Sequence, residues 1–150
     1  MNRQRTLSRR RHERGFTLIE IMVVVIIIGL LAAIVAPNVI GNVDKAQIQK
    51  ARADIRNIES ALNLYRLDNF AYPSTEQGIE ALVTKPNDPN IRNWNPGGYL
   101  PRVPKDPWGF PYQYLNPGTH GAIDIYTLGA DNRPGGEGNN ADIGNWDVDE

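Results

Sequence analysis

The chain has 150 residues and a mass of 16.7 kDa, which is a length for one modest domain with appendages. It contains no cysteine, which excludes disulfides, thiolate metal ligands and cysteine nucleophiles. The net charge of -1 conceals an asymmetry, because residues 1–15 hold six arginines and one glutamate, whereas residues 16–150 hold ten basic and sixteen acidic side chains. The acidic balance of the larger part argues against nucleic-acid binding.

Residues 16–36 form an apolar run of 21 residues in which Glu20 is the only charged side chain. A helix of this length spans about 30 Å, the thickness of the hydrocarbon core of a bilayer. Arginines precede the run and no comparable basic cluster follows it, so we expect a single-pass helix with the N-terminus in the cytoplasm and the rest outside. A secretory signal cleaved after the alanines at its end is the alternative.

The residues on either side of the start of this run argue against the signal-peptide alternative. The string Arg14-Gly15-Phe16-Thr17-Leu18-Ile19-Glu20 closely resembles the cleavage motif of the type IV pilin superfamily. The resemblance implies that prepilin peptidase, a membrane aspartyl peptidase, cuts between Gly15 and Phe16 and methylates the new amino group of Phe16. Residues 1–15 are then a leader, and residues 16–36 are a retained helix for membrane insertion and polymerisation. Glu20 would pair with the Phe16 amine of a neighbouring subunit, because an unpaired charge in an apolar fibre core is costly.

Residues 37–69 are predicted to form an amphipathic helix outside the membrane. Pro37 and Gly41 predict a kink or local unwinding near its start. Apolar residues then recur at steps of three and four. They are Ile48, Ala51, Ile55, Ile58, Leu62 and Tyr65. This stripe needs a partner, which residues 70–150 can supply; a free-standing coiled coil is the alternative, although the period persists for less than three heptads.

Residues 70–150 are rich in proline and are predicted to form a small head with short elements. Residues 76–84 read as a short helix capped by Ser74 or Thr75, with Ile79, Leu82 and Val83 on its inner face. Residues 112–115 and 122–128 read as strands joined by a turn at residues 116–118. In the second strand, alternation places Ile123, Ile125 and Thr127 on one side and Asp124, Tyr126 and Leu128 on the other. An α+β fold follows, with a small antiparallel sheet packed on the long helix.

Several strings in this region resemble the major pseudopilins of type II secretion systems. Asp106-Pro107-Trp108-Gly109 matches their DPWG signature, and locally it reads as a turn with Trp108 available to the core. Further similar strings lie at residues 65–83, 97–109 and 141–147, so the resemblance covers nearly the whole chain from Gly15. It implies a pilin-like fold, in which a long N-terminal helix, membrane-spanning in its first half, packs on a small antiparallel β-sheet with a calcium-binding C-terminal loop.

Residues 128–142 form a glycine-rich loop with several oxygen-bearing side chains. Calcium takes six to eight such oxygens and accepts irregular chain, although the EF-hand spacing is absent and composition alone favours a solvated acidic loop. The resemblance implies that Ca²⁺ binds here, through the carbonyl of Leu128 and the side chains of Asp131 and Asp142. Asn140 is a further candidate through its amide oxygen. Such an ion would take the place of the disulfide found in many true pilins.

The sequence offers little material for catalysis, so we expect a protein that is not an enzyme. Its only histidines are His12 and His120, which excludes a catalytic triad. A carboxylate pair for glycoside hydrolysis stays open on sequence alone, but nothing supports one. Trp94, Trp108 and Trp146 are interpreted as packing residues, with a sugar-binding face as the alternative.

The function that the resemblance implies is structural. A major pseudopilin is a homopolymer subunit of a periplasmic fibre, the pseudopilus, built on the inner membrane. The implied partners are minor pseudopilins, prepilin peptidase, an inner-membrane assembly platform with its ATPase, the outer-membrane secretin, and membrane lipid. The alternatives are a type IV pilin for adhesion or motility, which the absent cysteine pair disfavours, and a membrane-anchored calcium-dependent binding module, which leaves the motif at residues 15–20 unexplained.

Overall fold

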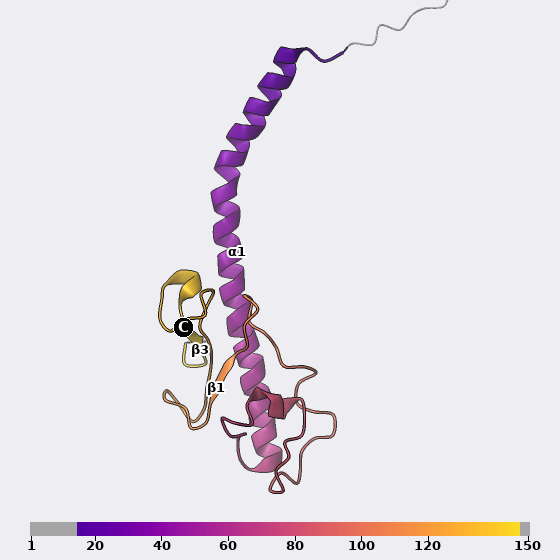
Figure 1. Ribbon diagram of the computed structural model, residues 1–150, viewed down its shortest axis with the longest axis vertical. Helices are drawn as coiled ribbons and strands as arrows, with labels where there is room; N and C mark the ends of the chain where they lie inside the picture. The colour runs from indigo at the N-terminus through magenta and orange to yellow at the C-terminus, as the bar shows by residue number, and fades with distance from the viewer. Residues whose placement is uncertain (1–14, 148–150) are drawn as a thin grey trace, which may run out of the picture. The chain divides into compact units, whose positions relative to one another are not determined.

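The computed structural model describes residues 15–147, without the side chains of residues 36–40. Residues 1–14 of the predicted leader lie outside the described residues. The elements in chain order are α1 (Leu18–Asn69), the 3-10 helix η1 (Ile79–Leu82), β1 (Gln113–Leu115), β2 (Asp124–Thr127), the 3-10 helix η2 (Gly138–Asn140) and β3 (Ile143–Gly144) (Figure 1). The predicted α+β class is confirmed. The chain divides into two units, one ending at Ile40 and the other, the head, beginning at Gly41.

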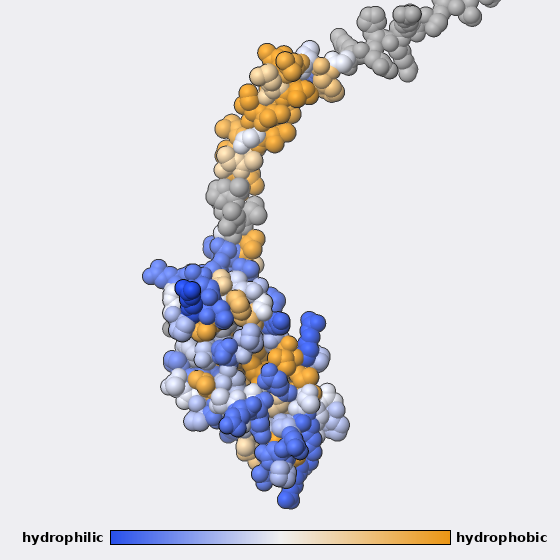
Figure 2. All heavy atoms as spheres, viewed as in Figure 1, coloured by the Kyte–Doolittle hydropathy of each residue, from blue (hydrophilic) through white to orange (hydrophobic). Residues whose placement is uncertain are grey.

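The first half of α1 is uncovered. The segment Leu18–Val35 is long and apolar enough to cross a membrane, and none of it is buried against other parts of the chain. Figure 2 shows its surface as an almost continuous hydrophobic band. The sequence predicts a kink or local unwinding at Pro37 and Gly41, and the unwinding is wrong, because helical backbone continues through both residues. Proline removes one backbone donor from a helix, and the remaining bonds of α1 are sufficient to carry the helix past it.

The second half of α1 provides the centre of the head. The predicted stripe is confirmed, since Ala51, Ile55, Ile58, Leu62 and Tyr65 are all buried and Ile48 packs against them. Residues of η1, of the three strands and of the loops before them cover this stripe. They include Ile79, Leu82, Ile91, Tyr112, Tyr114, Ile123, Ile125 and Ile143.

The helix predicted at residues 76–84 is shorter than expected. Ser74 and Gln77 close a turn first, because the Gln77 N–H donates to Ser74 Oγ at 3.2 Å and the Ser74 N–H donates to Gln77 Oε1 at 3.0 Å. Gly78 follows with a φ of 62°, which interrupts a helical path, and only Ile79–Leu82 is helical. Ile79 and Leu82 are buried as predicted, and Val83 is half-buried.

The sheet has three antiparallel strands in the order β1-β2-β3. The predicted hairpin is confirmed, with Tyr114 opposite Ile125, although both strands are shorter than expected. Strand β3 was not predicted, and its two residues pair with Tyr126 and Thr127. Ile123, Ile125 and Thr127 are buried as the alternation predicts, but Asp124 is buried too.

The turn at residues 106–109 fastens the loops to the sheet. The Gly109 N–H donates to the Asp106 carbonyl at 3.0 Å, which confirms the predicted turn. The buried Asp106 carboxylate accepts the N–H groups of Trp108 at 3.1 Å and Phe110 at 2.8 Å, and it also accepts the hydroxyl of Thr127. Trp108 packs partly buried against the core, as predicted.

We predict that Leu62→Ala destabilises the head by about 2–5 kcal/mol, because it removes a fully buried side chain at the centre of the core. Leu67→Ala, on the same helix but 72% exposed, is the matched control and should change stability by less than about 0.5 kcal/mol. Urea unfolding of the full-length protein in detergent measures both. Equal effects of the two substitutions would contradict the packing described here.

Candidate functional site

The C-terminal loop, residues 128–142, is closed by backbone contacts between its two ends. The Ala130 N–H donates to the Asn139 carbonyl at 2.8 Å. Gly129 has a φ of 70°, and a Cβ at this position would lie 2.7 Å from the Asn139 carbonyl oxygen and 2.9 Å from that of Ala141. Only glycine allows this close approach without strain. The loop is therefore shaped by its own backbone.

Inside the loop, two oxygen atoms are left without partners. Asp131 Oδ1 accepts the Arg133 N–H at 3.2 Å, and Asp142 Oδ2 accepts the Gly135 N–H at 2.9 Å. Asp142 Oδ1 and Asn139 Oδ1, in contrast, are buried and accept no hydrogen bond. A buried polar atom without a partner is costly and calls for an explanation. No three acidic or histidine side chains gather into a metal cluster within residues 15–147, so any cation here relies on amide and carbonyl oxygens as well as carboxylates.

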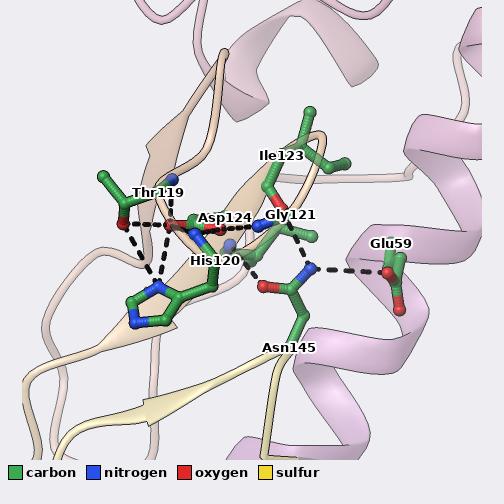
Figure 3. A network of polar contacts seen from close by, with 8 residues as sticks. Glu59, Thr119, His120, Gly121, Ile123, Asp124 and Asn145 are labelled. Carbon is green, nitrogen blue, oxygen red and sulfur yellow. Dashed lines mark hydrogen bonds and ion pairs between the residues drawn. The ribbon is translucent and has the colours of Figure 1, made fainter.

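A buried carboxylate organises the turn before β2 (Figure 3). Asp124 Oδ2 accepts the backbone N–H and the hydroxyl of Thr119, both at 2.7 Å, and Asp124 Oδ1 accepts the Gly121 N–H at 3.2 Å. The backbone N–H of His120 donates to Oδ2 at 3.1 Å, and its ring Nδ1 lies 3.0 Å from the same oxygen. Burial alone raises the pKa of Asp124, but the hydrogen bonds from Thr119 and His120 outweigh it and lower the pKa to about 2.

His120 connects this turn to the segment that follows the loop. Its ring stacks on Trp146 with the centroids 3.7 Å apart and the planes at 18°. A Cβ at Gly144 would lie 2.4 Å from Cη2 and Cζ2 of the Trp146 ring and 2.5 Å from its Cε2, so the indole sits close against the backbone of β3. Trp146 therefore packs within the head, in agreement with its predicted packing role.

Asn145 ties the end of the chain to both β2 and α1. Its side chain accepts the Ile125 N–H at 3.1 Å and donates to the Ile123 carbonyl at 3.1 Å and to Glu59 Oε1, on α1, at 3.4 Å (Figure 3). Neither Asn145 nor Asp124 was identified as a site residue from the sequence. The string at residues 141–147 indicated this segment of the chain. It could not predict these hydrogen bonds, because they depend on which turn packs beside the segment.

At the other end of the chain, Glu20 takes part in a capping box. The Glu20 N–H donates to Thr17 Oγ1 at 3.2 Å, and the Thr17 N–H donates to Glu20 Oε2 at 3.5 Å. This role of Glu20 was not predicted from the sequence, although the Thr-x-x-Glu spacing is its signature. The carboxylate is thus held over the first turn of α1, next to the exposed Phe16. Gly15 and Phe16 lie immediately before the helix.

Comparisons with known proteins identify the family of this chain. Residues 38–146 match the family described as "Type II secretion system (T2SS), protein G", and residues 10–36 match "Prokaryotic N-terminal methylation motif". The chain is 58% identical over 142 residues to the type II secretion system core protein G of Vibrio cholerae, with 95% of this chain and 97% of that protein covered. It is 60% identical over 139 residues to that of Pseudomonas aeruginosa, with 92% and 98% covered.

A solved structure is also similar. It is the crystal structure of the major pseudopilin from the type 2 secretion system of enterohaemorrhagic Escherichia coli. The match has a TM-score of 0.64 at 52% identity and covers 73% of this chain and 95% of that one. The chain therefore belongs to the type II secretion system protein G family. Its role is that of a major structural subunit of the pseudopilus, and the matches do not favour a pilin for adhesion or motility.

We predict that Asp124 makes the head sensitive to acid. The folded pKa of about 2 lies below the ordinary value of 3.8, so the ionised carboxylate contributes stability above pH 3.8 and this contribution is lost as the pH falls through about 2. The difference corresponds to about 2 kcal/mol. Asp124→Asn should lack this component in urea unfolding measured from pH 6 to pH 2.

The exposed residue Glu76 offers the matched control, since Glu76→Gln also removes one carboxylate. It should retain the acid-dependent loss of the parent chain. If Asp124→Asn and the parent lost stability in parallel below pH 4, the assigned role of Asp124 would be wrong.

Proposed function

We propose that this chain polymerises from the inner membrane into a periplasmic fibre whose growth drives folded proteins through the outer-membrane secretin. The uncovered apolar half of α1, Leu18–Val35, is the observation that supports this proposal. Such a surface needs lipid or neighbouring helices around it, and both are apolar, so exchange between them has no large hydrophobic cost. The chain acts by assembly and not as an enzyme.

The proposal includes a defined orientation and a processing step. The six arginines of residues 1–15 support a cytoplasmic N-terminus, and the head then lies in the periplasm. Prepilin peptidase cleaves between Gly15 and Phe16 and methylates the Phe16 amine, in agreement with the methylation motif matched at residues 10–36. The assembly platform with its ATPase adds subunits at the base of the fibre, and minor pseudopilins complete it.

Within the fibre, we assign Glu20 to the amine of a neighbouring subunit. The capping box already holds the carboxylate at the N-terminal end of α1, where the positive end of the helix dipole favours an anion. Cleavage creates the Phe16 amine. The amine of a neighbouring copy can then offer the Glu20 carboxylate a full positive charge in place of the partial positive charges at the end of its own helix. In apolar surroundings this pairing is strong, and leaving it unmade is costly.

We predict that Glu20→Ala and Glu20→Gln are both cleaved and inserted but fail to assemble, because each lacks the negative charge. Glutamine retains the hydrogen-bond acceptor of the capping box, so it separates capping from ion pairing. Sheared fibres are quantified, and exoproteins are assayed in periplasm and medium. We expect exoproteins to accumulate in the periplasm with both variants. Normal fibres from Glu20→Gln would show that capping alone is needed and would refute the ion pair.

We further propose that the C-terminal loop binds Ca²⁺. The two buried oxygens without partners, Asp142 Oδ1 and Asn139 Oδ1, support a hard cation at this position. The carbonyl of Leu128 and the side chain of Asp131 complete the proposed set, and burial favours Asn139 over the exposed Asn140 as the amide ligand. The ion would neutralise the negative charge of the loop and lower the free-energy cost of burying these two oxygens without hydrogen-bond partners. With Asn139 in this position the set carries two carboxylates, which predicts modest affinity.

We predict that chelation with EGTA lowers the Tm of the protein, by about 10 °C relative to calcium at a hundredfold excess over its Kd. Asp142→Ala and Asn139→Ala should melt at the lower temperature with or without calcium. Glu137→Gln changes an exposed acid of the same loop outside the proposed set and is the matched control. A Tm that is unchanged by chelation would contradict the proposed site.

A further inference from the structure

The head exposes few large apolar side chains, and most of them gather at the end of α1. Among residues 41–147 they are Val43, Leu64, Leu67 and Phe70. Phe70 is the most exposed of the four, at 84%, and it follows directly after the last residue of α1. A cluster of exposed apolar side chains on a folded head is typical of an interaction site.

The backbone of Phe70 is strained as well. Its φ is 63°, and its N–H donates to the Arg66 carbonyl at 2.8 Å, which closes the end of α1. Glycine usually takes this left-handed position, because a side chain crowds the backbone there. In an isolated subunit, phenylalanine therefore strains the chain and also leaves an aromatic ring in water. Strain of this kind is characteristic of residues that serve a function.

A groove on the same head has a lining that suits an aromatic ring. We call it the apolar groove, and its volume is about 550 Å³. It lies between α1 and the loop that precedes β1, and the apolar side chains that line it include Ile58, Ala61, Leu64, Leu100, Pro101 and Pro104. Ile58 and Ala61 are buried, so the groove reaches the core of the head. Apolar sites of this form are those in which aromatic anchors bind.

Phe70 does not line the apolar groove of its own chain. With Asn63, Arg66 and Leu67 it borders a different hollow at the end of α1. A single copy therefore presents an exposed ring at one place and an open groove at another. The two surfaces can meet only between copies.

We propose that Phe70 of one copy inserts into the apolar groove of a neighbouring copy in the pseudopilus. This inference rests on the proposed polymerisation. An apolar side chain that fits a pocket elsewhere on the same molecule makes a heterologous contact, and repetition of that contact builds an open filament. The occupant of the groove is therefore a second copy of this chain. Insertion removes the ring from water, which offsets the strain of its backbone.

Phe70→Gly tests the contact through two readouts that should move differently. Glycine relieves the backbone strain, so the Tm of the full-length subunit in detergent should stay the same or rise. The yield of sheared fibres should fall about tenfold, because the buried ring is lost. Asn132→Gly is the matched control, since Asn132 is exposed, has a φ of 52° and lines neither the groove nor the hollow. It should leave the fibre yield unchanged.

A second variant blocks the groove and leaves Phe70 in place. Ser60 is exposed and lines the groove, so the ring of Ser60→Phe should fill it from within the same chain. We expect this variant to keep the parental Tm and to lose fibres about as strongly as Phe70→Gly. Ser60→Ala removes the same hydroxyl but leaves the groove open, and it should give normal fibres.

Cysteine cross-linking locates the contact, because the natural chain has no cysteine that could interfere. Asn57 lines the groove and Leu67 borders the hollow beside Phe70. In one copy they are separated by ten residues of α1, or about 15 Å, which a disulfide cannot span. Mild oxidation of fibres carrying Asn57→Cys with Leu67→Cys should therefore give a ladder of covalent multimers. Glu137→Cys with Leu67→Cys is the control pair and should give none.

The possible failures are distinguishable. Absence of fibres from the parent chain would contradict polymerisation itself. Normal fibres from Phe70→Gly, or a lower Tm of that variant, would overturn only the contact. Loss of fibres with Phe70→Gly but not with Ser60→Phe would assign the ring to a different partner and would overturn the role of the groove.

Discussion

One constraint governs this molecule, namely that half of its longest helix has nothing in its own chain to cover it. The second half of α1 buries Ile55, Ile58 and Leu62 beneath the head, whereas no residue of the segment Leu18–Val35 is buried. Water cannot accommodate so large an apolar band, so the chain depends on lipid or on other copies of itself. A single helix thus provides both the core of a soluble head and the means of joining subunits.

The head is ordered although it contains few residues in helices or strands outside α1, because buried carboxylates hold its irregular turns in place. Asp106 and Asp124 each collect backbone N–H groups from an irregular turn and hold that turn against β2. Each carboxylate therefore replaces several bonds that a sheet or helix would supply. Asn145 acts in the same way through its amide group. The proline-rich loops are thereby fastened without disulfides.

Local patterns in the sequence predicted the features that depend on neighbouring residues, namely the buried stripe of α1, the hairpin and the turn at Asp106. Contacts between distant segments were harder to foresee. Alternation placed Asp124 on the face of its strand opposite Ile123 and Ile125, but the turn at Thr119 folds over that face and buries the carboxylate. Strand β3 is too short to produce a periodic signal. The isolated amide oxygen of Asn139 became visible only once the two ends of its loop were seen to close together.

The capping box at the start of α1 has a consequence for subunits that are not yet assembled. A lone carboxylate inside a bilayer favours protonation or displacement of its helix toward the surface. Because Glu20 already accepts the Thr17 N–H, it has a local partner while the subunit diffuses alone. In a subunit that waits in the membrane before assembly, this contact would therefore keep the carboxylate hydrogen-bonded, so that its charge needs no second copy.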